Sequence, residues 1–322
     1  MRAFDFTAAR TLPEALRLAG PGSAFLAGGT TLVDLMKLDV LAPGRVIDIN
    51  RLPLHGIRQA RDGLRIGALE RMSDVARHPK TYPVIAEALA LSASPQLRNM
   101  ASIGGNLLQR TRCGYFRDVH MACNRRQPGS GCAALTGDNR THAILGTSDA
   151  CVATHPSDLA VALVALDASM RLVSRSGERL VRLAAFYRPP GDTPQVENDL
   201  RPGELITEVV VPRLPWARHS TYVKVRDRSS YEFALASAAV ALDVRGGVIR
   251  EARVAAGGVG TVPWRLPAVE AALRGKPPTR ATFEAAAAPA ADGARPLRGN
   301  AFKVTLLKRT IVRALTSLEG RS

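Results

Sequence analysis

Aromatic and acidic residues are both scarce in this 322-residue sequence. Phe, Trp and Tyr make up 5% of it, and 28 Asp and Glu stand against 44 Lys and Arg, which gives a formal net charge of +16. Such a charge attracts an acidic surface, an anionic cofactor or nucleic acid. A nucleic-acid-binding protein normally adds a fold motif or stacking aromatics to its basic surface, and the sequence has neither. We therefore expect no nucleic acid among its partners.

The sequence also lacks a long hydrophobic run. Its most apolar stretch, residues 159–166, is followed by Asp167 and Arg171, and it is far shorter than the roughly 18 residues of a membrane-spanning helix. Residues 1–6 are charged and have no apolar run of the kind found in a secretory signal. We expect a protein that does not enter a membrane and that carries no export signal of its own.

Cysteine is rare, but its four copies are not scattered. Cys113, Cys123, Cys132 and Cys151 all belong to one polar insert, residues 113–151, which is rich in Gly, Arg and Asn. Their spacing matches neither the paired C-x-x-C of zinc ribbons nor the compact run of bacterial ferredoxins. Two disulfides, a structural zinc and an iron–sulfur cluster are therefore all compatible with the residues alone.

Arginine and histidine are frequent around these cysteines. Local positive charge suits an anionic cluster or a pyrophosphate, and it equally suits a solvated or partner-facing basic surface. With four thiolates available, the histidines are expected beside the cysteines or at the surface and not as ligands. The residues concerned are Arg98, Arg110, Arg112, Arg117, Arg125, Arg126, Arg140, His120, His142 and His155.

Two glycine pairs lie where the hydrophobic pattern changes. Gly28-Gly29-Thr30 joins a strand-like stretch, residues 24–27, to a helical one, residues 32–37, and a second pair lies within residues 101–106. Glycine lets backbone N–H groups approach a pyrophosphate closely. A single Gly-Gly is more often an ordinary tight turn, but two such turns could bind the two ends of a dinucleotide.

Asp158 begins the apolar helix of residues 159–166. At that position a carboxylate can cap the helix, and it can equally accept hydrogen bonds from ribose or ribityl hydroxyls. Both roles stay open from the residues alone.

Other signals divide the chain. Thr11 caps an expected helix, and Pro212 to Pro215 marks an expected boundary. Beyond it we expect antiparallel strands, a loop or frayed helix over residues 279–297, and a closing amphipathic helix over residues 302–318. The expected strands are residues 220–225, 234–244 and 248–256.

Taken together, several segments resemble the FAD-binding subunits of molybdenum hydroxylases, and the resemblance spans essentially the whole chain. The segments that carry it are residues 25–32, 64–69, 101–106, 155–160, 202–206 and 222–234. It implies an α+β fold. A FAD-binding domain, residues 1–212, would consist of a small α/β subdomain and a larger antiparallel α+β subdomain with FAD between them. A C-terminal domain, residues 213–322, would hold an antiparallel sheet with helices.

The resemblance also implies the residues that bind FAD. Backbone amides around the pyrophosphate would come from Ala24, Phe25, Leu26, Ala27, Gly28, Gly29, Thr30, Thr31 and Leu32. Beside the flavin would lie Ser102, Gly104, Gly105 and Asn106. Asp158 would hold cofactor hydroxyls, Ile206 the adenine side, and Lys224 a charge near the cofactor. Relatives often have Asp or Asn where this chain has Thr31, which leaves one side-chain contact open.

The cysteine insert narrows the resemblance further. Residues 106–113, 123–126 and 128–135 resemble the flavin subunits of bacterial periplasmic aldehyde oxidoreductases that carry a [4Fe–4S] cluster. This implies that Cys113, Cys123, Cys132 and Cys151 are the ligands of such a cluster.

The implied function is electron transfer inside a heterotrimer that oxidises aldehydes. Electrons from a molybdenum-cofactor large subunit would pass through a [2Fe–2S] small subunit to FAD and on to an external acceptor. The location would be periplasmic by co-export with a partner, and otherwise cytoplasmic. Two alternatives remain: the flavin subunit of an aryl-CoA reductase, which has the same fold, and a zinc-stapled basic binding module without flavin.

Overall fold

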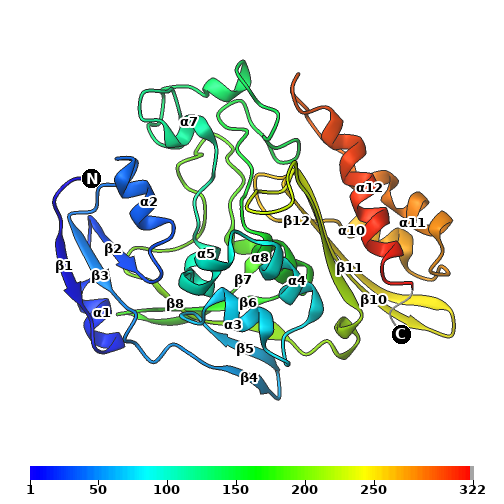
Figure 1. Ribbon diagram of the computed structural model, residues 1–322, viewed down its shortest axis with the longest axis horizontal. Coiled ribbons are helices and arrows are strands. Elements are labelled where there is room, and N and C mark those ends of the chain that lie inside the picture. Colours follow the sequence, from blue (N-terminus) through cyan, green and yellow to red (C-terminus); the bar gives the residue numbers. More distant parts are fainter. Residues whose placement is uncertain (320–322) are drawn as a thin grey trace.

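The computed structural model describes residues 1–319, which form three sheets that follow one another along the chain (Figure 1). The N-terminal subdomain has a parallel sheet of order β1-β3-β2 with two crossover helices. α1 begins after Thr11, whose Oγ1 accepts a hydrogen bond from the Glu14 N–H at 3.3 Å. The elements are β1 (Asp5–Ala8), α1 (Leu12–Leu18), β2 (Ser23–Leu26), α2 (Leu32–Lys37) and β3 (Arg45–Asp48).

The middle subdomain is an antiparallel sheet of order β4-β5-β8-β6-β7 with helices packed on it. Every residue of α8 is buried, which explains why its sequence is apolar on all sides. The strands are β4 (Ile57–Ala60), β5 (Gly63–Gly67), β6 (Ser169–Ser174), β7 (Gly177–Arg182) and β8 (Leu205–Pro212). The helices are α3 (Met72–Arg77), α4 (Pro83–Leu91), α5 (Pro95–Met100), α6 (Ile103–Leu107), α8 (Asp158–Ala165) and α9 (Leu183–Phe186).

The insert, residues 113–151, lies at the top of Figure 1 and has little regular structure. It contains the single helical turns α7 (Gly114–Arg117) and η1 (Ala133–Leu135). Phe116 of the insert is buried against Leu35 of α2, so the insert packs on the N-terminal subdomain.

The C-terminal domain is an antiparallel sheet of order β12-β11-β10-β9 covered on one face by helices. Its elements are η2 (Pro215–Arg218), β9 (Ser220–Val225), β10 (Ala236–Arg245), β11 (Val248–Gly257), β12 (Trp264–Arg265), α10 (Pro267–Leu273), α11 (Arg280–Ala287), η3 (Ala288–Ala291) and α12 (Phe302–Thr316). Of the two expectations for residues 279–297, a loop or a frayed helix, the first part follows the helix and is regular. Thr279 caps α11 by accepting from the Thr282 N–H at 3.3 Å, and Phe283 is buried.

The two faces of the C-terminal sheet belong to different cores, because side chains alternate along a strand. Ala239 and Ala241 of β10 join the core of the middle subdomain, around α8. Ala238 and Val240, their neighbours on the same strand, pack with Leu307 of α12. The sheet therefore stands between the middle subdomain and the C-terminal helices (Figure 1).

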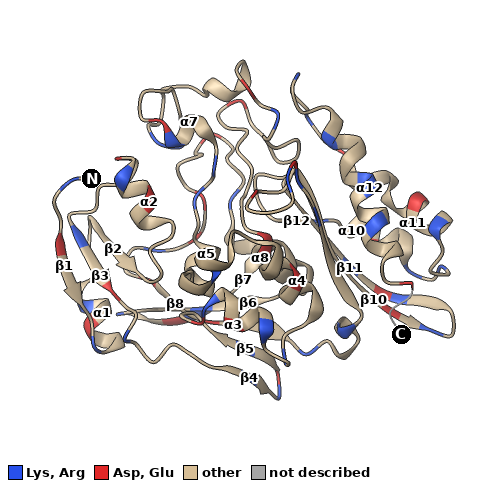
Figure 2. Cartoon of the chain, viewed as in Figure 1, with Lys and Arg blue, Asp and Glu red and all other residues tan. Residues whose placement is uncertain are grey.

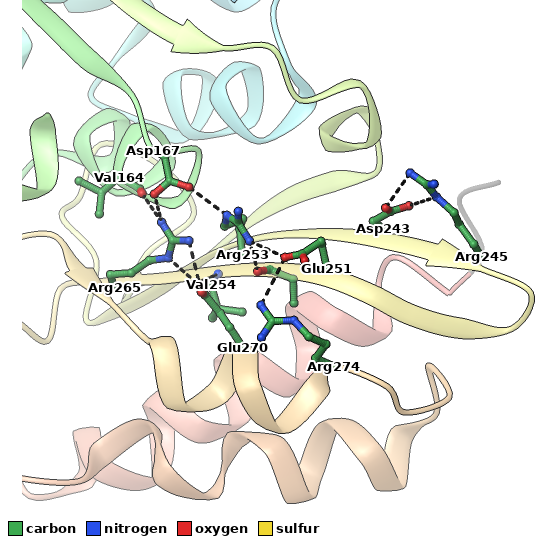
Figure 3. A network of polar contacts seen from close by, with 11 residues as sticks. Val164, Asp167, Asp243, Arg245, Glu251, Arg253, Val254, Arg265, Glu270 and Arg274 are labelled. Carbon is green, nitrogen blue, oxygen red and sulfur yellow. Dashed lines mark hydrogen bonds and ion pairs between the residues drawn. The ribbon is translucent and has the colours of Figure 1, made fainter.

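A network of ion pairs attaches the C-terminal sheet to the end of α8 (Figure 3). Asp167 accepts from Arg253 at 3.0 Å and from Arg265 at 2.8 Å. Arg265 also donates to the Val164 carbonyl at 2.8 Å and pairs with Glu270 of α10. Pairs of this kind contribute up to about 1 kcal/mol each, so they fix orientation while the apolar core supplies most of the stability.

Basic residues are spread over all three parts of the molecule and do not form a single stripe (Figure 2). Within residues 1–319, no helix combines the length and the apolar character needed to cross a membrane.

Candidate functional site

The first glycine pair lies between β2 and α2, as the sequence predicts. Gly29 has a φ of +72°, a conformation that residues with a side chain rarely adopt. At Gly28 a Cβ atom would lie 2.0 Å from the carbonyl oxygen of Met100, at the end of α5. Gly28 is thus the point at which the backbone of the N-terminal subdomain touches that of the middle subdomain.

Two polar side chains hold this contact in place. The Asn50 amide donates to the Ala27 carbonyl at 3.0 Å, and the Arg71 guanidinium donates to the Asn50 Oδ1 at 3.1 Å. Arg71 also donates to the Met100 carbonyl. Sequence reasoning missed both residues, because Asn50 is 23 positions from Ala27 and no local motif marks it.

The second glycine pair is not a turn but the first part of α6. The Ser102 Oγ caps this short helix by accepting from the Gly105 N–H at 3.2 Å. A Cβ on Gly104 would lie 3.1 Å from the Ala68 Cβ, so Gly104 lets α6 pack closely on the segment after β5. Gly105 is exposed. The Ser102 hydroxyl therefore already has a partner within α6.

Both glycine pairs line one cleft of about 680 Å³ between the N-terminal and middle subdomains. Twelve of the residues predicted to bind FAD lie along it: Ala24, Phe25, Ala27, Gly28, Gly29, Thr30, Thr31, Leu32, Ser102, Gly104, Gly105 and Ile206. A cleft floored by glycine backbone and apolar side chains fits a cofactor with an anionic centre and flat aromatic ends. The structure thus brings the two predicted turns together, 74 positions apart from Gly28 to Ser102.

The other four predicted residues do not line this cleft. Leu26 ends β2, and the Asn106 Oδ1 accepts from the Ser157 Oγ at 2.6 Å. Asp158 is 6% exposed and accepts from the Lys224 Nζ at 2.8 Å. The structure therefore places Asp158 and Lys224 in contact with each other.

Asp158 is the centre of a buried polar cluster. The Tyr222 hydroxyl donates to it at 2.7 Å and the Ser92 hydroxyl at 2.9 Å. Burial, and then the charge of Asp158, raise the pKa of Tyr222 well above its usual value, which keeps the hydroxyl as a donor. The helix cap itself is Ser157, whose Oγ accepts from the Ala160 N–H at 2.9 Å. Asp158 is thus free of the capping role that its position suggested.

Asp158 and Tyr222 also line a second pocket, of about 180 Å³, between the middle subdomain, the insert and the C-terminal domain. The wall on the insert side includes Cys113 and His142. The Asn106 Oδ1 of α6 accepts a hydrogen bond from Ser157, which lines this pocket, so α6 stands between this pocket and the glycine-lined cleft.

The four cysteines line one small cavity inside the insert. All four are free thiols, so the disulfide interpretation finds no pair in the structure. Burial raises the pKa of Cys113 to about 11 and also raises that of Cys132, which is the environment of a thiol that needs a cation to ionise. Within residues 1–319, no group of His, Cys, Asp or Glu is arranged to hold a single metal ion.

Two buried side-chain nitrogens face these thiols. The His142 Nε2 lies 3.2 Å from the Cys113 sulfur, and the Arg125 Nη2 lies 3.5 Å from the Cys151 sulfur. Arg125 is paired with Glu197 at 2.8 Å. Burial, and then the nearby charge of Lys303, lower the pKa of His142 to about 4, so its ring is neutral at neutral pH.

The dense arginines around the insert mostly bind groups of the same chain. Arg112 and Arg117 both pair with Asp34 of α2, at 2.8 and 2.7 Å. Arg140 makes a two-pronged contact with Asp227 of the C-terminal domain, at 2.6 and 2.8 Å. These arginines tie the insert to the N-terminal subdomain and to the C-terminal domain, a role that neither sequence interpretation anticipated.

The stability of the folded chain is expected to fall in acid because of His155, whose partly buried ring packs on Tyr187 with ring centroids 4.5 Å apart. Burial, and then Arg125, lower its pKa to about 3 from 6.5. The imidazole of His155 therefore gains its proton below pH 6.5 in the unfolded chain but only below about pH 3 in the folded chain. The free energy of unfolding consequently decreases as the pH is lowered from 6.5 to 3. The loss from this group should be roughly 2 kcal/mol between pH 7 and pH 4.5.

Urea unfolding of wild type and His155→Gln at several pH values checks this prediction. Glutamine does not titrate and keeps an acceptor for the Ser157 N–H, so the variant should lose less stability on acidification. Parallel pH profiles for the two proteins would show that His155 titrates normally in the folded state.

The geometry of the cleft agrees with the sequence families that the chain matches. The family described as the FAD binding domain in molybdopterin dehydrogenase matches residues 2–214. The CO dehydrogenase flavoprotein C-terminal domain matches residues 221–318. The chain therefore belongs to the family of FAD-binding subunits of molybdenum hydroxylases, and it is an oxidoreductase subunit.

Individual relatives cover nearly the whole chain. The aldehyde oxidoreductase FAD-binding subunit PaoB of Escherichia coli is 46% identical over 100% of both chains. The glyceraldehyde dehydrogenase medium chain of Sulfolobus acidocaldarius is 31% identical over 85% of this chain and 82% of that one. Among solved structures, carbon monoxide dehydrogenase of Hydrogenophaga pseudoflava aligns with a TM-score of 0.73 and 28% identity over 98% of this chain and 97% of that chain. The predicted family and α+β fold are confirmed.

Proposed function

We propose that the chain is the FAD- and [4Fe–4S]-carrying subunit of a heterotrimeric, molybdenum-dependent aldehyde oxidoreductase. In this assembly a large subunit holds the molybdenum cofactor, a small subunit holds [2Fe–2S] centres, and the chain passes electrons to an external acceptor. The observation that carries the proposal is the presence, in one member of this family, of both the glycine-lined cleft and the cavity lined by all four cysteines.

FAD is proposed to lie in the glycine-lined cleft, with its flavin end toward the second pocket. The turn at Gly28 and Gly29 offers bare backbone to the pyrophosphate, and Ile206 lies in the same cleft for the adenine side. Asp158 and Lys224 lie beyond α6. There the Asp158 carboxylate can accept hydrogen bonds from ribityl hydroxyls. The Lys224 ammonium, which is paired with Asp158, can provide positive charge beside the flavin. Bound FAD supplies the redox chemistry, and these residues supply position and charge.

A cluster fits the cysteine cavity better than a single ion. The thiols of Cys113, Cys123, Cys132 and Cys151 face one space, yet no set of them is arranged around one metal ion. A cluster keeps its thiolate ligands further apart than one ion does, because several irons lie between them. The nearby donors Arg125 and His142 suit sulfur atoms that carry negative charge.

The choice of aldehydes rests on the relatives, and the location is part of the proposal. A subunit of an aldehyde oxidoreductase is similar over the full length of the chain. A partner that carries an export signal would take the folded complex to the periplasm, and without such a partner the complex would remain in the cytoplasm.

Expression of the chain with and without its genomic neighbours tests the proposal. We expect aldehyde-dependent dye reduction only in the assembled complex, a flavin spectrum with a broad iron–sulfur shoulder, and recovery of the protein with the periplasmic fraction. The isolated chain should be inactive toward aldehydes.

Each part of the proposal has its own contrary result. Aldehyde turnover by the isolated chain would contradict its role as an electron-transfer subunit. Zinc without iron in metal analysis would exclude the cluster. Reduction of an aryl-CoA by the complex, with no turnover of aldehydes, would identify the related reductase instead.

A further inference from the structure

His142 occupies a position between the cysteine cavity and the C-terminal helix. Its side chain is buried, with 5% of the residue exposed, and its Nε2 lies 3.2 Å from the sulfur of Cys113. The other ring nitrogen, Nδ1, is buried without a hydrogen-bond partner. The ring therefore has one polar contact, and that contact is a cysteine sulfur.

The backbone of His142 is held by two fully buried polar residues. The Lys303 Nζ donates to the carbonyl of His142 at 2.9 Å, and also to those of Thr141 at 2.9 Å and Gly258 at 2.7 Å. The Asn300 amide donates to the same His142 carbonyl at 3.2 Å. Lys303 and Asn300 are both 0% exposed.

Burying a lysine is costly unless its amine makes hydrogen bonds. Here the amine has three backbone carbonyl acceptors, two in the insert and one at Gly258, the residue that follows β11. The Lys303 amine thus joins α12, the insert and the sheet at one point. Its removal would release the segment that carries His142.

The position of the ring hydrogen follows from the chemistry of the sulfur. A cysteine sulfur that binds iron carries no hydrogen, so a hydrogen bond between it and a neutral imidazole requires the hydrogen on Nε2. This tautomer leaves only a lone pair, and not an N–H group, on the unpartnered Nδ1. The buried surroundings therefore match a ring that donates to sulfur.

We propose that His142 donates a hydrogen bond to the Cys113 sulfur and thereby raises the reduction potential of the cluster, and that Lys303 is the positioning residue that keeps His142 there. The inference rests on the proposed [4Fe–4S] cluster. Hydrogen bonds to the sulfurs are one of the factors that set the potential of such clusters, because they stabilise the more negative reduced form. The C-terminal domain would then adjust the electron affinity of a centre that belongs to the FAD-binding domain.

Redox titration of the full chain, followed by electron paramagnetic resonance, tests the proposal in His142→Phe and His142→Gln. Phenylalanine keeps a flat ring and removes the donor, whereas glutamine keeps an N–H group. We expect the phenylalanine variant to favour the oxidised cluster about tenfold more than wild type, a shift of about 59 mV to lower potential for one electron. Glutamine should restore most of the wild-type value. His120→Phe, at an exposed position of the insert, is the matched control and should not shift the potential.

Lys303→Met should shift the potential in the same direction, because the His142 backbone loses its main hydrogen-bond donor. Lys308→Met changes a lysine of the same helix that is only partly buried, and it should leave the potential unchanged. Unchanged potentials in both His142→Phe and Lys303→Met would overturn the proposal.

Loss of iron is also informative. If His142→Phe lacks iron while His142→Gln retains it, the donor is required and the proposal is supported. If both lose iron, the shape of the ring and not its hydrogen bond holds the insert, and the proposal fails. Iron missing from the wild-type chain would instead refute the proposed cluster itself, and the inference with it.

Discussion

Gly28→Val is expected to deprive the chain of FAD. The new Cβ would lie 2.0 Å from the Met100 oxygen and 2.7 Å from its carbonyl carbon, and both are backbone atoms. Arg71 holds that carbonyl in place, so the turn must move away from α5 and from the adjoining Ser102. The two walls of the cleft would then no longer face the pyrophosphate together. We expect FAD affinity to fall at least about tenfold, or about 1.4 kcal/mol.

FAD content after gel filtration, and the Kd of the apoprotein for FAD, measure this effect. Gly20→Ala is the matched control, because Gly20 lines the same cleft and a Cβ atom added there would meet no other atom within 4 Å. It should keep full FAD occupancy. Full occupancy in a folded Gly28→Val protein would mean that the pyrophosphate lies elsewhere.

Cys132→Ser is expected to remove the iron and to leave FAD bound. The Cys132 thiol lines the cavity shared by all four cysteines, and its backbone pairs with Cys123 across a short antiparallel bridge. Loss of one ligand should therefore also loosen the loop between them. Cys132 lines neither the glycine-lined cleft nor the second pocket, so the flavin should remain.

Iron and flavin contents of the purified variant, together with hydrogen exchange over the insert, check this prediction. His120→Ala, at an exposed position of the same insert, should retain its iron and its exchange pattern. Wild-type iron content in Cys132→Ser would show that the ligand set is wrong. Joint loss of iron and FAD would show that the insert supports the flavin site directly.

Local sequence patterns predict those helices, strands and helix caps whose formation depends on residues that are neighbours in the sequence. The Thr11 cap, the strand of residues 220–225 and the final helix all appear where they are expected. β7 was not expected, because its residues 177–182 form a polar edge strand with little hydrophobic signal. The regular helix α11 was not expected, because the Ala, Pro and Gly content of residues 279–297 resembles that of a loop or frayed helix, whereas burial of Phe283 stabilises α11.

The site depends more on contacts between distant residues. Gly28 and Gly29 could be recognised from sequence, but the Met100 carbonyl that makes Gly28 necessary could not, because it lies 72 positions away. Asp158 could be recognised as a polar residue on an apolar helix. Its partners Ser92, Tyr222 and Lys224 come from α4's end and from β9, and only the fold brings them together.

The burial of Lys303 also could not be predicted from the sequence. In the sequence it is an ordinary lysine of an amphipathic helix, and helical periodicity gives no reason to expect it inside the protein. Only the three carbonyl oxygens around its amine explain its burial.

The position of Lys303 also bears on when the segment that carries His142 is fixed during synthesis. Its contacts with Thr141 and His142 span 162 and 161 residues. A ribosome adds roughly 5–20 residues per second, so all four cysteines leave it several seconds or more before Lys303 does. Throughout that interval the loop at His142 lacks its anchor. If the proposed cluster is inserted during synthesis, its iron would enter before Lys303 has fixed the segment that carries His142.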